Sequence, residues 1–308
     1  MIPYISFEDG EKHIDWIDLT DALAAGHALP RAEISDSLLY RGEDTLLQRQ
    51  AWIDGLGIAV KSATVFPGNP ASDVPMINGA VTLFDDTNGT LSALIDFHLV
   101  TKWKTAGDSL LAARRLARPD SRHILIIGAG TVGRNLHAAY SAAFPQANFT
   151  VWNRTKANAE KMASEIDGLS VATDLETAVR KADIITSATM TSEPTLRGDW
   201  LQPGQHIDLI GAYRPDMREA DDTTLQRARL FVDSFETTLD HIGELKIPLT
   251  EATIKREDVL ADFYALDKFQ RHSDTEITLF KNGGGAHLDL MTSRYILEQW
   301  QAAQRTLG

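Results

Sequence analysis

The chain of 308 residues is 43% hydrophobic and 24% charged, which is typical of a soluble globular protein, and its length is comfortable for two domains. The net charge of -13 argues against a nucleic-acid partner, because phosphate binding requires clustered Lys and Arg. The absence of cysteine excludes disulfides, thiolate zinc sites and cysteine nucleophiles.

The amino-terminal stretch MIPYISFEDGEKHIDWID has acidic residues where a signal peptide needs a basic start and a long apolar run. No uninterrupted apolar segment of the sequence approaches the length that spans a membrane. We therefore expect a cytoplasmic protein with no membrane partner. No two histidines have the i, i+4 spacing of a metal site, and His241 with Glu244 is interpreted as a solvated pair, so we predict no metal.

The first third of the chain predicts a mainly antiparallel α+β domain. Segments 57–66 and 79–97 have the pattern of strands, and DDTNGT within the second is a hairpin signal. Segment 99–117 predicts a helix with alanines and leucines along one side. We expect residues 1–117 to form a substrate-binding and dimerisation domain, completed by a long amphipathic helix at 287–308.

The middle of the chain predicts an α/β domain of the Rossmann type. From residue 121 to 234, apolar runs alternate with segments of helical spacing and short turns, which is typical of a parallel, doubly wound sheet. The expected strands lie in HILIIGAG, NFTVWN, LSVAT, DIITSAT, HIDLIGA and LFVDS. We place this nucleotide-binding domain at residues 118–286.

The motif GAGTVG places Gly128, Gly130 and Gly133 in the G-x-G-x-x-G spacing, with Thr131 and Val132 between them. It follows a predicted strand and opens a predicted helix, which is the context that a dinucleotide site requires. The glycines permit a tight turn and close approach of the backbone to the pyrophosphate, and the helix amino terminus supplies N–H groups and partial positive charge.

The second predicted strand ends in VWNRTK, where an NAD site usually carries an acid for the ribose hydroxyls. This chain instead has Asn153, Arg154, Thr155 and Lys156. Arg154 can pair with a 2′-phosphate, and Thr155 can donate a hydrogen bond to it. The sequence therefore favours NADPH over NADH, with a solvated Arg154 at the start of a helix as the alternative.

Two lysines in the first domain are candidates for binding an anion. Lys61 lies in an otherwise apolar strand, and a buried lysine needs a negative partner, either a substrate carboxylate or a nearby Asp. Lys104 lies in TKWKTAGDS at the start of the predicted helix, where a solvent-facing charge is the alternative.

Seven segments occur in the order found in one known family. They are VKSATVFPGN, TKWKTAGDSLLA, IGAGTVG, WNRTKANAEKMA, ITSATMTSEPTL, PGQHIDLIGAYRPDMREAD and ITLFKNGGGAHLDL. Over roughly residues 30 to 295 the chain resembles the ornithine cyclodeaminase/mu-crystallin family, and WNRTKANAEK with RPDMRE is similar to its mu-crystallin and ketimine reductase side. The resemblance implies a homodimer with an antiparallel domain and a Rossmann domain.

The resemblance also implies site residues. The substrate carboxylate would be held by Arg31, Lys61 and Lys104, with Arg41 as a rival for Arg31. The family has an arginine where this chain has Lys104, which keeps the charge and loses the bidentate fork. Further candidate cofactor-binding residues in the quoted motifs are Ala188, Thr189, Gly211 and Lys281.

In ornithine cyclodeaminases the loop after the strand that corresponds to HIDLIGA presents a catalytic aspartate, and this chain has Tyr213 there. A tyrosine is a poor base near neutral pH, because its hydroxyl ionises only near about pH 10. Cyclodeamination is therefore disfavoured unless Asp216 substitutes. Tyr213 is a candidate acid, or an aromatic residue at the pocket rim.

We therefore predict an NADPH-dependent ketimine reductase, which reduces Δ1-pyrroline-2-carboxylate to L-proline, with the six-membered piperideine homologue as a second candidate substrate. Lys61 would fix the carboxylate during catalysis. Four alternatives stay open: reductive amination of a 2-oxo acid as in the family's alanine dehydrogenases, dehydration of 3-hydroxyproline, cyclodeamination of ornithine, and a crystallin-like protein that binds NADPH and a small ligand.

Overall fold

The structure, a computed structural model, describes residues 2–307, and the chain divides into two compact units. Unit 1 consists of Met1–Lys104 and Gly285–Gly308, and unit 2 is Thr105–Gly284. The helix α3 (Phe97–Leu116) begins in unit 1 and ends in unit 2. Within residues 2–307, no helix has both the length and the apolar character that crossing a membrane requires.

Unit 1 is built on a six-stranded sheet in the order β1-β6-β5-β4-β3-β2, in which β1 pairs with β6 in parallel and all other neighbours are antiparallel. The strands are β1 (Tyr4–Ile5), β2 (Glu33–Arg41), β3 (Asp44–Ile53), β4 (Gly57–Val65), β5 (Ile77–Phe84) and β6 (Leu91–Asp96). Along β4, Ala59, Lys61 and Ala63 are buried on one face and alternate with half-buried residues on the other.

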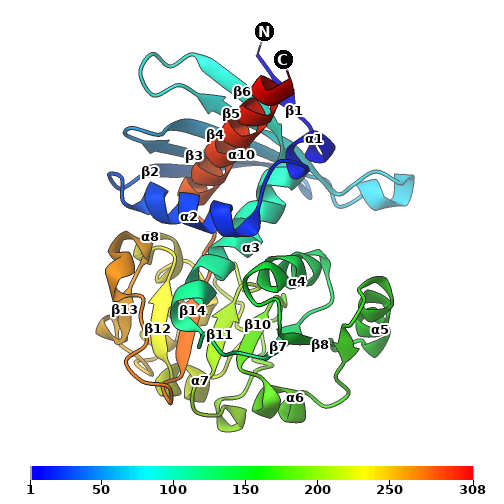
Figure 1. Cartoon of the computed structure of the whole chain (residues 1–308), viewed down its shortest axis with the longest axis vertical. Coiled ribbons are helices and arrows are strands. Elements are labelled where there is room, and N and C mark those ends of the chain that lie inside the picture. The colour runs from blue at the N-terminus through cyan, green and yellow to red at the C-terminus, as the bar shows by residue number, and fades with distance from the viewer. Residues whose placement is uncertain (1, 308) are drawn as a thin grey trace. The chain divides into compact units, whose positions relative to one another are not determined.

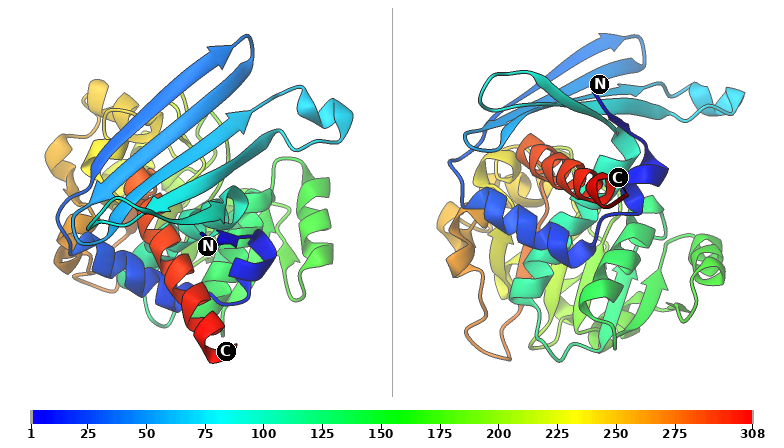
Figure 2. Two further views of the ribbon diagram at one scale, coloured as in Figure 1. Left: turned by 90° about the horizontal axis from the view of Figure 1, so that it is seen from above. Right: turned by 45° about the horizontal axis from the view of Figure 1, so that its top comes forward.

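The buried face of this sheet is covered by the long helix α10 (Ala286–Leu307), which lies along β3 and β4 (Figures 1 and 2). The helix α2 (Trp16–His27) packs against α10, and α1 (Phe7–Glu11) contacts α10 as well. The other face carries exposed aromatic side chains, among them Tyr4 and Trp52. The short helix η1 (Asn69–Ser72) lies in the connection between β4 and β5.

Unit 2 contains an eight-stranded sheet in which every pair is parallel, in the order β13-β12-β14-β11-β10-β7-β8-β9. The chain runs from β7 to β8 and β9 on one side and then to β10 and β11 on the other, so the strand order reverses between β7 and β10. The strands are β7 (His123–Ile127), β8 (Asn148–Trp152), β9 (Ser170–Val171), β10 (Ile184–Ser187), β11 (His206–Leu209), β12 (Arg229–Val232), β13 (Val259–Ala261) and β14 (Thr278–Lys281). In such sheets, ligands bind beyond the carboxyl ends of the strands at the reversal point.

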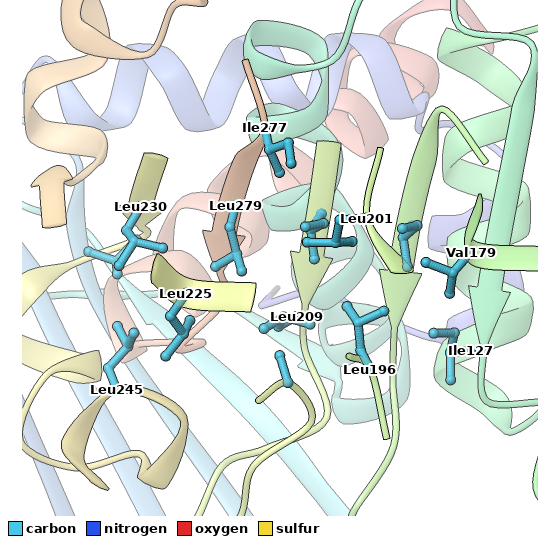
Figure 3. Packing of buried hydrophobic residues seen from close by; sticks show 14 of the residues in the cluster. Ile127, Val179, Leu196, Leu201, Leu209, Leu225, Leu230, Leu245, Ile277 and Leu279 are labelled. Atoms are coloured by element: carbon cyan, nitrogen blue, oxygen red, sulfur yellow. The ribbon is translucent and has the colours of Figure 1, made fainter. Parts of the chain in front are cut away.

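The helices of unit 2 connect these strands, as a parallel sheet requires. They are α4 (Thr131–Ala143), α5 (Lys156–Glu165), α6 (Leu175–Lys181), α7 (Asp222–Arg227), α8 (Phe235–Thr238), α9 (Gly243–Thr250), η2 (Gly198–Trp200), η3 (Arg256–Asp258) and η4 (Phe263–Lys268). Ile127, Leu209 and Leu279 of the sheet pack with Leu225 of α7 and Leu245 of α9 in one buried apolar cluster (Figure 3). This core holds the strand ends, and therefore the loops that follow them, in place.

Candidate nucleotide and carboxylate sites

The glycine-rich turn of unit 2 connects β7 to α4. Gly128 has a φ of 111°, and a Cβ there would lie 2.8 Å from the carbonyl oxygen of Ala188, so a side chain fits neither the conformation nor the space. A Cβ on Gly130, in contrast, would meet no atom within 4 Å. Gly130 is the N-cap of α4 and makes no side-chain capping bond, so the helix start offers its N–H groups to an anion. These features fit a nucleotide pyrophosphate.

A cleft of about 300 Å³ lies over this turn. Its lining comes from the carboxyl ends of β7, β8 and β10, at the reversal of strand order. It brings together seven of the residues that the sequence assigns to the cofactor: Gly128, Gly130, Asn153, Arg154, Thr155, Ala188 and Thr189. The position and lining of the cleft suit a dinucleotide.

Asn153 joins the two loops at one end of the cleft. Its Oδ1 accepts the backbone N–H of Ala129 at 3.1 Å, and its Nδ2 donates to the carbonyl oxygen of Thr155 at 2.9 Å. Arg154 is exposed at the rim. Since neither residue is acidic, nothing in this pair would repel a 2′-phosphate.

Both lysines of the predicted cofactor set lie outside this cleft. Lys156 pairs with Glu160 one helical turn further along α5, at 2.7 Å. Lys281 is fully buried in β14, where its Nζ donates to the carbonyl oxygens of Leu209 at 3.0 Å and Asn282 at 2.6 Å. Thr131, Val132 and Gly133 form the first turn of α4, and Gly211 follows β11.

Unit 1 contains a buried cluster of opposite charges. Lys61 Nζ donates to Asp289 Oδ1 and to Thr101 Oγ1, both at 2.8 Å, and Lys104 Nζ lies 3.9 Å from the same Asp289 oxygen. Each lysine is only 6% exposed. Lys61 Nζ also lies 4.6 Å from the centre of the Phe97 ring. Two ammonium groups thus converge on one carboxylate in an environment with little water.

Burial dominates the electrostatics of this cluster. It lowers the pKa of Lys61 to about 8, against the opposing effect of Asp289, and the charge of Lys104 lowers the pKa further. Burial opposes ionisation of Asp289, but Lys104 and Lys61 outweigh it and lower the pKa of that carboxyl. Burial, followed by the charge of His27, holds the pKa of His287 well below its usual value. Asp289 is therefore an ion, and Lys61 loses its proton more readily than an ordinary lysine.

The structure corrects the expected position of Lys104. The sequence placed it at the start of a helix, but α3 begins earlier, at Phe97, and the Oδ1 of Asp96 accepts the N–H of Leu99 at 2.9 Å. Lys104 is therefore an interior residue of the helix, and it is buried rather than turned to solvent.

The arginine of unit 1 that pairs with Lys61 in the sheet register is Arg49, which the sequence reasoning missed because β3 was not predicted. It binds Asp36 at 2.9 Å, and its charge acts on both Lys61 and Asp289. The predicted Arg31 is exposed between α2 and β2, and its rival Arg41 pairs with Asp44 at the end of the β2–β3 hairpin.

The loop that follows β11 carries Tyr213, whose exposed fraction is 59%. Arg214 makes two hydrogen bonds of 3.0 Å to the carboxylate of Asp216, and this contact lowers the pKa of Asp216. The structure also corrects the reading of Glu244 as a solvated residue: it is fully buried and accepts backbone N–H groups. Among residues 2–307, no group of three or more His, Asp or Glu side chains could hold a metal ion.

The chain is similar to proteins of a known family. The model of the ornithine cyclodeaminase/mu-crystallin family matches residues 53–304. The chain is 49% identical over 301 residues to a Δ1-pyrroline-2-carboxylate reductase of Paracoccus denitrificans, covering 95% of each chain. It is 33% identical over 249 residues to the ketimine reductase mu-crystallin of Mus musculus, covering 80% of this chain and 77% of the mouse protein.

A solved structure of a reductase is also similar to this chain. The Δ1-pyrroline-2-carboxylate reductase of Thermococcus litoralis, in complex with NADH and L-proline, superposes with a TM-score of 0.88 at 27% identity. The alignment covers 99% of this chain and 98% of that one.

Proposed function

Because the chain belongs to the ornithine cyclodeaminase/mu-crystallin family, we propose that it is an NADPH-dependent reductase that converts Δ1-pyrroline-2-carboxylate to L-proline. It is an oxidoreductase that acts on C=N bonds, as its pyrroline-carboxylate and ketimine reductase relatives are. The observation that carries the proposed substrate is the buried cluster of Lys61, Lys104 and Asp289, which is suited to an amino-acid or imino-acid carboxylate.

Lys61 is the main anchor of the substrate. Its Nζ has three protons, of which one is directed to Asp289 and one to Thr101, so a third is left for an oxygen of the substrate carboxylate. Lys104 adds a second positive charge near the same point. Because the cluster is buried, each charge acts more strongly on the carboxylate than it would in water.

The cofactor-binding residues of unit 2 favour NADPH. The glycine-rich turn and the start of α4 hold the pyrophosphate, and Arg154 binds the 2′-phosphate at the rim of the cleft. When bound, the nicotinamide supplies the hydride for the C=N bond. The Thermococcus protein binds NADH, so the preference for NADPH in this chain depends on Arg154 and on the absence of an acid at position 153.

Imine reduction suits this chain better than cyclodeamination. Tyr213 is largely exposed, and Asp216 is held by Arg214 with its pKa lowered, so neither is a good general base. A cyclic imine that arrives already protonated needs no such base. Its requirement is a fixed orientation, which the contact between its carboxylate and Lys61 supplies.

The test is to add freshly generated Δ1-pyrroline-2-carboxylate, to measure the oxidation of NADPH by its loss of absorbance, and to identify L-proline as the product. Fast turnover with NADPH and weaker turnover with NADH would support both the reductase activity and the preference for NADPH. The piperideine homologue, tested in parallel, decides whether the six-membered ring is also a substrate. Turnover only in the presence of ammonia and a 2-oxo acid would identify an alanine-dehydrogenase-like enzyme instead.

Two other outcomes separate the remaining alternatives. Consumption of 3-hydroxyproline or ornithine without net change in the nicotinamide would identify a lyase. Tight NADPH binding without turnover of any of these compounds would identify a binding protein. Each result contradicts the reductase assignment.

We also propose that the protein is a homodimer, formed through the open face of the sheet in unit 1. Trp52 of β3 and Tyr4 of β1 are 49% and 57% exposed there, although aromatic side chains of this size are normally buried. Trp52→Glu should convert a dimer to a monomer in size-exclusion chromatography with light scattering. A wild-type monomer at micromolar concentration would contradict the dimer.

A further inference from the structure

Glu219 occupies an unusual position in unit 2. It lies in the segment between β11 and α7, and its side chain is fully buried. The family motifs quoted above assign it no role in binding the cofactor or the substrate. Burying a carboxylate is costly unless hydrogen bonds replace its lost water. The contacts of Glu219 therefore indicate what the residue does.

The two oxygens of Glu219 serve two different loops. Oε1 accepts the N–H of Thr189 at 2.8 Å, the hydroxyl of Thr189 at 2.9 Å and the hydroxyl of Ser187 at 2.6 Å. Oε2 accepts the N–H groups of Gly211 at 2.5 Å and Ala212 at 3.2 Å. One side chain thus fastens the end of β10 to the start of the loop that carries Tyr213.

The two loops also meet backbone to backbone. A Cβ on Gly211 would lie 2.1 Å from the carbonyl oxygen of Thr189 and 2.2 Å from its nitrogen, so only glycine allows this approach. Thr189 lines the nucleotide cleft. A shift of the loop away from Glu219 would therefore move a wall of the cleft.

A second buried carboxylate holds Glu219 itself. Glu244 of α9 accepts the N–H of Glu219 at 2.7 Å and that of Ala220 at 3.1 Å. Burial raises the pKa of both glutamates, that of Glu244 to about 7, and the nearby charge of Lys281 opposes this rise. Lys281, which the sequence assigned to the cofactor, donates its hydrogen bonds to the carbonyl oxygens of Leu209 and Asn282 and contributes a positive charge near this pair.

We infer that Glu219 is a positioning residue of the nucleotide site, which fixes Thr189 and the Gly211–Ala212 turn in the arrangement that binds the nicotinamide cofactor. Both oxygens face backbone N–H groups, which can only donate, so the ionised carboxylate is the form that these contacts select. This role rests on the nicotinamide site proposed above, and it concerns the binding of the cofactor rather than the chemical step.

The substitution Glu219→Gln tests this role without leaving a cavity. The glutamine retains one acceptor oxygen, which suits Gly211 and Ala212, and its NH₂ group can donate to the hydroxyls of Ser187 and Thr189. The N–H of Thr189 then faces another donor and loses its acceptor. The predicted defect is therefore local to Thr189.

The measurement is the Kd of NADPH by fluorescence titration without imino acid, together with hydrogen exchange of the 187–191 and 211–213 segments. We expect Glu219→Gln to raise the Kd about tenfold, because a hydrogen bond to a charged group is lost and a buried donor is left unpaired. Exchange should become faster at Thr189 than at Gly211, and the KM for the imino acid should stay within about twofold of wild type if the carboxylate cluster of unit 1 is untouched.

The matched control is Glu251→Gln, an exposed glutamate directly after α9, which should leave the Kd unchanged. Ser187→Ala removes one hydroxyl donor to Oε1 and should raise the Kd of NADPH about two- to threefold. If Glu219→Gln fails to fold, this variant tests the positioning role in its place. A folded Glu219→Gln protein, or failing that Ser187→Ala, that binds NADPH as tightly as wild type would overturn the inference. If wild type binds NADPH but reduces no imine, the reductase assignment fails, while the Kd still tests Glu219.

Discussion

The two candidate sites use charge in opposite ways. In unit 1, Lys61 and Lys104 are buried around one carboxylate, and their positions are fixed by packing of α3, β4 and α10. In unit 2, the nucleotide cleft is lined mainly by glycines and uncharged residues, and the charged Arg154 in its lining is exposed. A buried charge interacts more strongly with its partners than an exposed one, and removing it costs more free energy. Substitutions in unit 1 should therefore have the larger effects.

The largest expected effect is that of Lys61→Met. Losing one member of a buried, hydrogen-bonded charge pair should lower kcat/KM for the imino acid about one hundred- to one thousandfold, mainly through KM. The Kd of NADPH, measured separately, should change little. Lys12→Met, which removes an exposed lysine of the same unit, is the control. An unchanged KM in a Lys61→Met protein with wild-type thermal unfolding would refute the anchor role.

The next effect is a pH dependence of carboxylate binding. Lys61 binds an anion only while protonated, and its pKa in the free protein is lowered to about 8. The Ki of pyrrole-2-carboxylate, a planar ring acid without a titrating imine, should be constant below that pH and rise by about tenfold per pH unit above it. A Ki that stays flat to pH 10 would exclude Lys61 as the titrating group.

Asp289→Asn tests the same pH dependence from the side of the partner carboxylate. Because Asp289 raises the pKa of Lys61, its removal should move the rise of Ki to a lower pH, in addition to weakening the fold of unit 1. The direction is the informative result, since a shift to higher pH would mean that Asp289 does not stabilise the charge of Lys61. Asp9→Asn, at an exposed carboxylate in the same unit, should leave the profile unchanged.

A smaller effect is expected at the exposed cation of unit 2. Arg154→Ala should raise the KM of NADPH about fivefold and leave that of NADH unchanged, because solvent and salt screen the pair with the 2′-phosphate. The difference between the two cofactors should shrink as salt is added. Arg180→Ala, an exposed arginine of α6, serves as the control. Equal changes in the KM of both cofactors would mean that Arg154 does not bind the 2′-phosphate.

The smallest effect should come from Tyr213→Phe. The side chain is 59% exposed and only its hydroxyl is removed, so kcat should stay within about twofold of wild type if the imine arrives protonated. Kinetics from pH 6 to pH 10 provide the measurement. A loss of tenfold or more, with the alkaline limb of kcat displaced, would make Tyr213 the general acid.

The nucleotide half was largely predictable from the sequence, because its signals are local. The glycine spacing after an apolar run places Gly128 at the end of β7 and α4 directly behind it, as predicted. The strands β1, β2, β3, β13 and β14 were not predicted. With β3 missing, nothing in the sequence could place Arg49 opposite Lys61.

The sequence by itself determined the α/β class, the glycine-rich turn and the presence of a lysine in an apolar strand, since each depends on neighbouring residues and on backbone preferences. Only the tertiary structure decided which partners these residues have. Asp289 lies 228 positions from Lys61 and reaches it only because α10 packs on the sheet. In the sequence, Glu219 is one more charge in a loop. Only the pairing of β10 with β11 brings the loops that follow them together, so that the N–H groups of Thr189 and Gly211 point to its carboxylate. Hydrogen bonds act over a few ångströms, so the partners of a buried charge are set by the packing of distant segments, which no local pattern records.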